Sequence, residues 1–247
     1  MMGTQKIFAY PHATVKCEGC PNRHGGICGS LSEDELEKLN NIARRRRVRQ
    51  NLPIFRAGDH VTSFVSIVSG VVKLTDTTRA GKHRVITLLY APAFLGFSYD
   101  DLHRFSAMAA TEVELCTYPS SSFNRLLLES PAINREVMEH TQRELEFARD
   151  WTLMLCCTSS YERVAGFFSV ITRRAAGGAT ATNEQCRNWF LLPLKREEIA
   201  DYLGLTIETV SRNITRLKHK GLIELKSARE IRVPDLDRLT AEASVEG

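Results

Sequence analysis

The chain has 247 residues and a net charge of +4, and 43% of its residues are apolar while 25% are charged. This composition is typical of a globular protein with one large or two modest domains. It argues against a membrane protein, because the longest uncharged stretch, Val85–Tyr99, contains Pro92 and is shorter than the roughly 18 apolar residues of a membrane span. No charged-then-apolar signal segment begins the chain, which favours a cytoplasmic protein.

Residues 1–30 are rich in glycine, cysteine, histidine and proline and predict an irregular arm. The chain has seven cysteines, an odd number, so metal or thiol chemistry is a better interpretation than a disulfide framework. Cys17 and Cys20 are spaced to bind one metal centre, and Cys28 returns to it on the Gly25-Gly26 loop. From the arm alone, zinc held by these three cysteines plus His12 or His24 and an iron–sulfur cluster are equally supported.

Residues 31–130 predict a short helix followed by a small antiparallel β-domain. Ser32 is suited to cap a helix whose first turn is acidic, and Leu36 and Leu39 lie on its apolar stripe. From about Val48 to Pro119, segments dense in β-branched and aromatic residues alternate with turn residues, which is typical of a sandwich or barrel. The basic run at residues 44–47 is expected to be a solvated surface.

Residues 131–160 predict one long helix that begins at Pro131. A stripe of residues recurs in steps of three and four, which is the spacing of a coiled-coil seam. The stripe is Met138, Thr141, Leu145, Ala148, Thr152 and Leu155. Its hydrophobicity is weak, so pairing should be marginal and open to regulation. Phe147, Trp151 and Met154 lie on a second face, which we expect to pack on the β-domain.

Residues 161–247 predict a separate unit that contains a helix-turn-helix. Helices are expected over about 195–203 and from Thr206 to Gly221. Ala200 allows the two helices to cross closely, Gly204 makes the corner, and Val210 fills the angle between them. Residues 222–225 and 230–233 predict a β-hairpin, the wing of a winged helix.

The second helix of this unit is suited to reading double-stranded DNA. Glu208, Ser211 and Arg212 share one face near its N-terminus, where a recognition helix meets base edges. Arginine pairs with guanine and glutamate accepts from cytosine. Basic and hydroxyl side chains around this face are suited to phosphates. They are Lys195, Arg196, Thr206, Thr209, Arg216 and Lys218.

The segment ADYLGLTIETVSRNITRLKHKGLI resembles the DNA-binding end of the Crp–Fnr transcription regulators. Its Glu-x-x-Ser-Arg pattern is similar to the one with which Fnr-type members read TTGAT-like half-sites. The β-domain resembles the cyclic-nucleotide-type β-roll of the same superfamily, and the segment after Pro131 falls where its dimer helix lies. The resemblance therefore implies an α+β fold with an N-terminal cysteine arm, a β-roll, a long dimerisation helix and a C-terminal winged helix-turn-helix.

Cyclic AMP is not the expected effector. The family's phosphate cassette corresponds to Phe105-Ser106, which lacks its arginine, and the stretch that carries the ribose-binding glutamate corresponds to FLGF. A buried phosphate without a cation is costly. Arg104 is adjacent, but in an extended segment its side chain points to the opposite face.

The cysteine spacing resembles the alphaproteobacterial, oxygen-responsive FnrN/FixK-like branch. This resemblance implies that Cys116 is the fourth ligand of a 4Fe-4S cluster with Cys17, Cys20 and Cys28. It also implies a dimer that binds a TTGAT-N4-ATCAA-like inverted repeat when oxygen is scarce and recruits RNA polymerase at genes of low-oxygen respiration or nitrogen fixation. Ala148 aligns with an acidic residue that opposes pairing in the enteric relative, so control of dimerisation is expected to differ.

Two other classes of protein stay open at this point. One is a regulator of the same superfamily that responds to thiol redox state, haem or a small ligand, with zinc or nothing in the arm. The other is a metal-dependent enzyme or electron carrier, but the sequence offers no nucleophile–base constellation or paired carboxylates for catalysis. Cys156 and Cys157 are interpreted as packing residues, and Cys186 as a candidate exposed thiol.

Overall fold

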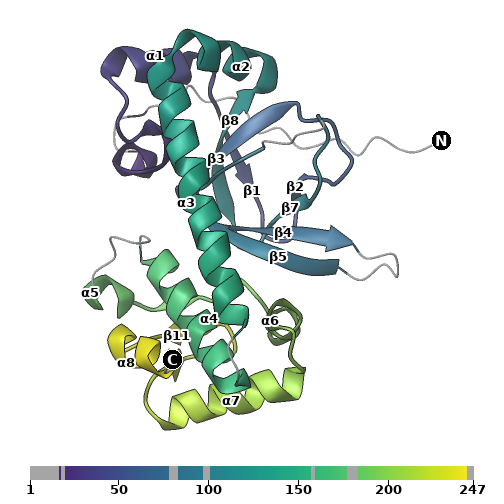
Figure 1. Cartoon of the computed structure of the whole chain (residues 1–247), viewed down its shortest axis with the longest axis vertical. Coiled ribbons are helices and arrows are strands. Elements are labelled where there is room, and N and C mark those ends of the chain that lie inside the picture. Colours follow the sequence, from purple (N-terminus) through teal and green to yellow (C-terminus); the bar gives the residue numbers. More distant parts are fainter. Residues whose placement is uncertain are drawn as a thin grey trace, which may run out of the picture. The chain divides into compact units, whose positions relative to one another are not determined.

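A computed structural model describes residues 17, 20–77, 83–96, 101–156, 159–176 and 183–243 (Figure 1). The chain divides into two compact units, residues 1–74 with 88–142 and residues 75–87 with 143–247. The mixed α+β architecture expected from the sequence is confirmed, with a β-roll, a long helix and a C-terminal helix-turn-helix. None of the described helices is both long and apolar enough to cross a membrane.

The β-roll consists of two four-stranded sheets. The first has the order β1-β8-β3-β6, and its strands are β1 (Arg44–Val48), β8 (Val113–Pro119), β3 (Ser63–Ser69) and β6 (Phe94–Leu95). The second has the order β2-β7-β4-β5, and its strands are β2 (Pro53–Phe55), β7 (Ser106–Ala109), β4 (Val71–Thr77) and β5 (His83–Tyr90).

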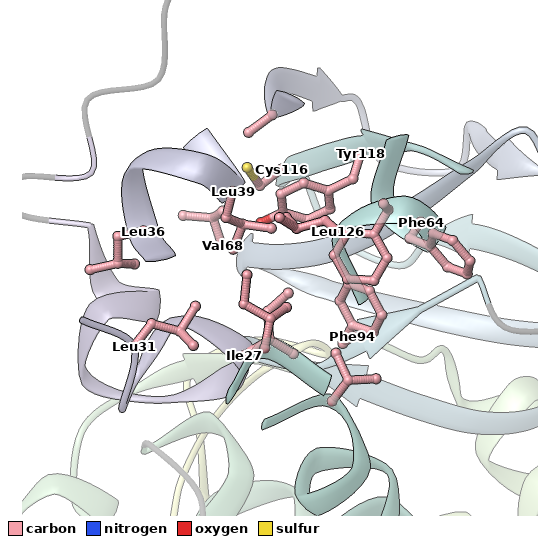
Figure 2. Packing of buried hydrophobic residues seen from close by; sticks show 14 residues of the cluster. Ile27, Leu31, Leu36, Leu39, Phe64, Val68, Phe94, Cys116, Tyr118 and Leu126 are labelled. Carbon is pink, nitrogen blue, oxygen red and sulfur yellow. The ribbon is translucent and has the colours of Figure 1, made fainter. Parts of the chain in front are cut away.

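Strand β8 carries two different environments on its two faces because successive side chains of a strand alternate. Val113 and Leu115 are buried in the core between the sheets. Cys116 and Tyr118 point the other way, into a second hydrophobic cluster that also holds residues of the arm and of the neighbouring helices (Figure 2). The cysteine predicted as a ligand therefore lies outside the roll's own core.

The second cluster is covered by the arm and three helices. These are the short 3-10 helices η1 (Pro21–His24) and η2 (Gly26–Cys28), and the α-helices α1 (Glu33–Ile42), α2 (Ser120–Glu129) and α3 (Pro131–Leu155). Helix α1 begins as predicted: Ser32 accepts from the backbone of Glu35, and the Glu35 carboxylate accepts from the backbone of Ser32. The buried Asn22 amide donates to the Ser66 hydroxyl at 2.8 Å and fixes η1 to β3.

The stripe predicted for dimerisation lies at the surface of α3. Met138 and Leu145 are 57% and 51% exposed, and the other stripe residues are exposed or half-buried. The partner expected for the second face of α3 was the β-domain, but Trp151 on that face packs on the aromatic rings of Phe167 and Tyr202 of the second unit.

The second unit is helical and carries a small sheet. Its elements are α4 (Ser160–Ala175), α5 (Asn183–Cys186), β9 (Phe190–Leu191), α6 (Arg196–Leu203), α7 (Ile207–His219), β10 (Glu224–Leu225), β11 (Glu230–Arg232) and α8 (Leu236–Ala243). The predicted wing hairpin is present as β10 and β11, and β9 extends it to a three-stranded sheet.

One expectation for a single cysteine was wrong. Cys186 is buried rather than exposed, because α5 packs against α4 and α8. Cys156 is exposed in the single chain, directly after α3, and its packing in a dimer stays a prediction. Cys157 lies outside the described residues.

Candidate metal centre and candidate nucleic-acid interface

The four cysteines predicted as ligands line one cavity. Cys17, Cys20 and Cys28 come from the arm, and Cys116 comes from β8, far away in the sequence. The cavity and the open space at its mouth together amount to about 320 Å³. The rest of its lining consists of the apolar side chains of Leu36, Leu39 and Ala43 and of four side chains with polar groups, which belong to Asn22, Asn40, Arg45 and Tyr118.

Local backbone structure holds the arm cysteines around this cavity. The Cys20 amide donates to the Cys17 carbonyl at 3.1 Å, and the Arg23 amide donates to the Cys20 carbonyl at 3.0 Å. These two turns bend the arm so that both thiols face inward. Gly26 has a φ of 63°, and a side chain there would meet the backbone of Pro92. Glycine is therefore required where the loop turns toward Cys28.

The thiols of Cys28, Cys116 and Cys17 have raised pKa values. Burial raises the pKa of Cys28 to about 12, with smaller contributions from Cys116 and the other two arm cysteines. Burial also raises the pKa values of Cys116 and Cys17. The hydroxyl of the buried Tyr118 is hydrogen-bonded to the sulfurs of Cys28 and Cys116. A metal or cluster would replace these protons, since thiolates are the ligating form.

The donor set fits a sulfur-ligated group. Four thiols from two segments surround one cavity, which is the ligand number of a cubane iron–sulfur cluster. Among the described residues no group of three or more His, Cys, Asp or Glu side chains lies close enough to hold a single ion. His12 and the side chain of His24, the other zinc donors considered from the sequence, lie outside the described residues.

The helix-turn-helix has the geometry expected from its sequence. Gly204 ends α6 in the left-handed conformation with a φ of 65°, and Thr206 caps α7 by accepting from the Thr209 amide at 3.2 Å. Ala200 and Val210 are buried between the two helices. The turn is short because glycine makes it without steric cost.

The residues predicted to read bases lie on the solvent side of α7. Glu208, Ser211 and Arg212 are exposed, and the Arg212 guanidinium donates to the Thr209 hydroxyl at 3.5 Å. Among the predicted phosphate contacts, the exposed ones are Lys195, Thr206, Arg216 and Lys218. Thr209 is half-buried, and Arg196 is half-buried with a pKa that burial lowers.

Comparisons with known proteins match both units. Residues 45–130 match the cyclic nucleotide-binding domain, and residues 162–242 match the Crp-like helix-turn-helix domain. A probable transcriptional activator of Rhizobium leguminosarum bv. viciae is 38% identical over 91% of this chain and 92% of its own length. The chain belongs to the Crp–Fnr family, on its Fnr/FixK-type branch.

Other relatives of this Crp–Fnr regulator agree with that assignment. The transcriptional activator protein FnrL of Cereibacter sphaeroides is 33% identical, and the match covers 96% of this chain and 95% of FnrL. The solved structure of FixK2 from Bradyrhizobium japonicum superposes with a TM-score of 0.71 at 25% identity, over 83% of this chain and 100% of that one. The chain is thus a DNA-binding transcriptional activator, and regulators of this family are dimeric.

The sequence did not indicate one residue of the cysteine cavity. Arg45 belongs to the basic run that was expected to be solvated, yet its side chain is 17% exposed and its Nη2 lies 3.1 Å from the Cys20 sulfur. Strand alternation separates Arg45 from Arg44 and Arg46, so the run does not share one surface. Nothing in the sequence indicates that this strand pairs with the one that carries Cys116.

The DNA-binding unit of the Crp–Fnr regulator also holds two side-chain contacts that the sequence did not indicate. The buried Asn213 donates to the Ser160 hydroxyl at 3.1 Å and ties α7 to the start of α4. The Arg216 guanidinium lies over the Tyr161 ring, 4.1 Å from its centroid. Both contacts fix the direction of the recognition helix against α4, and neither has a local sequence signature.

Proposed function

We propose that this Fnr/FixK-type regulator senses oxygen through a 4Fe-4S cluster held by Cys17, Cys20, Cys28 and Cys116. The observation that carries the proposal is that four thiols, three from the arm and one from β8, line one cavity. When bound, such a cluster supplies an oxygen-labile, redox-active group. The seven other lining residues shield that group from bulk solvent, and Tyr118 and Arg45 offer hydrogen bonds to its thiolates.

The residues around the cavity give ligation a mechanical consequence. The ligands join the arm to β8, and the hydrophobic cluster that packs against them includes Ile133 and Val137 of α3. Fastening the arm therefore consolidates the packing of the first turns of α3. Release of the ligands frees the arm and loosens that packing, which shifts the balance between monomer and dimer.

Dimerisation is proposed to run along the exposed stripe of α3. The stripe joins two copies through Met138, Thr141, Leu145, Ala148, Thr152 and Leu155, all of them exposed or half-buried within one chain. Only a dimer presents two recognition helices about 34 Å apart, which is one turn of DNA. Because Ala148 carries no charge, the stripe lacks a repulsive element at that position, and the dimer should persist more readily than one with an acidic residue there.

The proposed operator is a TTGAT-N4-ATCAA-like inverted repeat. Glu208, Ser211 and Arg212 are proposed to read bases, and the exposed basic and hydroxyl residues around them to hold phosphates. The bound dimer would recruit RNA polymerase at genes for life at low oxygen, in the cytoplasm. The names of two relatives, a nitrogen fixation regulation protein and a fumarate and nitrate reduction regulatory protein, support this role.

The test is an anaerobic preparation of the full chain, analysed for iron, acid-labile sulfide and absorption before and after air. Cluster sensing predicts equal iron and sulfide, near four of each per chain, and their loss in air together with loss of operator binding. The second candidate is a Crp–Fnr regulator without a cluster that responds to thiol redox state, haem or a small ligand, with zinc or nothing in the arm, and it predicts an anaerobic protein without acid-labile sulfide that still binds the operator. The proposed domains are the cysteine-rich arm at residues 1–30, the β-roll at 31–130, the dimerisation helix at 131–160 and the DNA-binding domain at 161–247.

A further inference from the structure

Arg45 makes a direct contact with one of the proposed ligands. Its Nη2 donates to the Cys20 sulfur at 3.1 Å, although Arg45 lies on β1 and Cys20 in the arm. An N–H···S bond of this kind is made best by a thiolate, since the charged acceptor strengthens the hydrogen bond. The contact links the arm to the roll at a ligand itself.

The position of the guanidinium is fixed by the sheet. Arg45 and Cys116 are directly opposed in the β1–β8 ladder, so their side chains leave the sheet on the same face. The Arg45 Nη1 lies 3.8 Å from a carboxylate oxygen of Glu114, two residues before Cys116 on β8. That nitrogen is buried and makes no hydrogen bond within the described part of the chain, so it retains donor capacity at the cavity wall.

The cavity has a charge imbalance that Arg45 can offset. Four thiolates around an iron–sulfur core leave a net negative charge in a largely apolar pocket, and such a charge is costly unless it is paired. Arg45 is the one cationic side chain among the described residues that line the cavity. The reduction potential and the stability of a cluster depend on the net charge around it and on hydrogen bonds to the sulfurs.

We propose that Arg45 is a positioning residue of the cysteine site. Its guanidinium orients the Cys20 thiolate, offsets the negative charge of the ligand set, and thereby slows the loss of the bound group in air. The proposal rests on the proposed function above, and it names a determinant of oxygen sensitivity that lies outside the cysteines. This role requires both the positive charge and the several N–H donors of the planar guanidinium, so another long side chain would not be enough.

The experiment compares four variants of the full chain with the wild type. Arg45→Gln removes the charge and the fork, and Arg45→Lys retains the charge. Glu114→Gln removes the ion pair but leaves the N–H···S bond. Arg47→Gln is the matched control, because Arg47 is an exposed arginine on the same strand. Each protein is reconstituted under nitrogen, and iron and sulfide content, midpoint potential, bleaching rate in air and melting temperature of the iron-free form are measured.

Arg45→Gln should lose the group in air on the order of 10–100-fold faster than the wild type, the usual effect of an outer-shell change. Its midpoint potential should fall because a positive charge and a donor are lost. Arg45→Lys should lie between the two, and Arg47→Gln and Glu114→Gln should match the wild type. The melting temperature of iron-free Arg45→Lys should be unchanged, which separates positioning from a role in folding.

Two results would overturn the inference without touching the proposed function. The first is a wild type that binds the group and an Arg45→Gln protein with the same bleaching rate and potential. The second is an equal effect of Glu114→Gln, which would assign the role to the ion pair. If Arg45→Gln does not fold, the Arg45→Lys protein is compared with the wild type instead. A wild-type bleaching rate and midpoint potential in Arg45→Lys would contradict the proposed need for the guanidinium. A wild type without iron and sulfide would end both proposals.

Discussion

The Trp151 indole stacks on the Tyr202 ring, with 4.5 Å between the ring centroids and 16° between the planes. Trp151 lies near the end of α3, the proposed pairing helix, and Tyr202 lies on α6, the first helix of the helix-turn-helix. Phe167 of α4 packs edge-on against both rings. Within the second unit, the last turns of α3 therefore pack against the first helix of the helix-turn-helix.

Trp151→Ala should destabilise the second unit and weaken operator binding. Trp151 is buried, and deletion of a buried aromatic side chain costs about 3–5 kcal/mol of the free energy of unfolding. Urea denaturation followed by circular dichroism measures the loss. Leu153→Ala is the control, because Leu153 lies on the same helix and is 70% exposed. Equal losses for the two variants would contradict a specific role for the aromatic stack.

Replacement of a ligand on either side of the cavity should have the same effect. Cys20→Ser and Cys116→Ser should each abolish the bound cluster and the anaerobic DNA binding, since a cubane needs four thiolates. Iron and sulfide assays and an anaerobic gel-shift measurement check this. Cys156→Ser should behave as the wild type because Cys156 is exposed at the end of α3. Full operator binding by either ligand variant without oxygen would refute the four-cysteine assignment.

Arg212→Ala should relax specificity at one guanine of each half-site, by about 1–3 kcal/mol in the comparison of matched and substituted operators. Lys218→Ala should instead weaken binding to all sequences alike and reduce the salt dependence, because it is proposed to contact a phosphate. Fluorescence anisotropy titrations on operator variants at several salt concentrations separate the two patterns. A uniform loss for Arg212→Ala would reassign that residue to a phosphate.

Leu145→Glu should produce a monomer without unfolding the chain. Leu145 is 51% exposed within one subunit, so a charge there costs little in the monomer but would be buried in the proposed seam. Analytical ultracentrifugation of anaerobic protein measures the dimer constant. Leu153→Glu changes an equally apolar, more exposed residue off the stripe and should leave the dimer intact. A dimer that survives Leu145→Glu and dissociates with Leu153→Glu would place the seam on another face.

The first unit should lose stability in mild acid through His103. Burial in contact with the Phe55 ring lowers the pKa of His103, and the Asp59 carboxylate offsets part of the effect. Below about pH 6.5 the unfolded chain binds the proton more readily than the folded chain, because His103 has its ordinary pKa when unfolded. The free energy of unfolding therefore falls as the pH decreases below that value, and the contribution of His103 is fully present above it. Urea midpoints between pH 5 and 8 should therefore fall less steeply for His103→Gln. His60→Gln, at an exposed site, should retain the wild-type slope.

Local chemistry made part of the fold predictable. The helix cap at Ser32 and the left-handed turn at Gly204 depend on a few adjacent residues, and both are present as predicted. Strand β9, by contrast, has two residues, Phe190 and Leu191, and exists because β11 pairs with it. Such a short segment has no periodicity to detect.

The cysteine site was predictable in its ligands but not in its surroundings. The spacing of Cys17, Cys20 and Cys28 is a local pattern, and family resemblance pointed to Cys116. The inward direction of Arg45 depends on strand pairing that brings β1 beside β8. The packing of Trp151 likewise depends on Tyr202, which is distant in sequence, so hydrophobic spacing indicated a buried face without indicating its partner.

The central claim is tested most directly by one anaerobic sample of wild-type protein that is divided in two, with one half exposed to air. Iron, sulfide and operator affinity are measured on both halves. The account predicts iron and sulfide and tight operator binding in the first half, and loss of all three in the second. A colourless, iron-free anaerobic protein that binds the operator as tightly as its air-exposed half would contradict it.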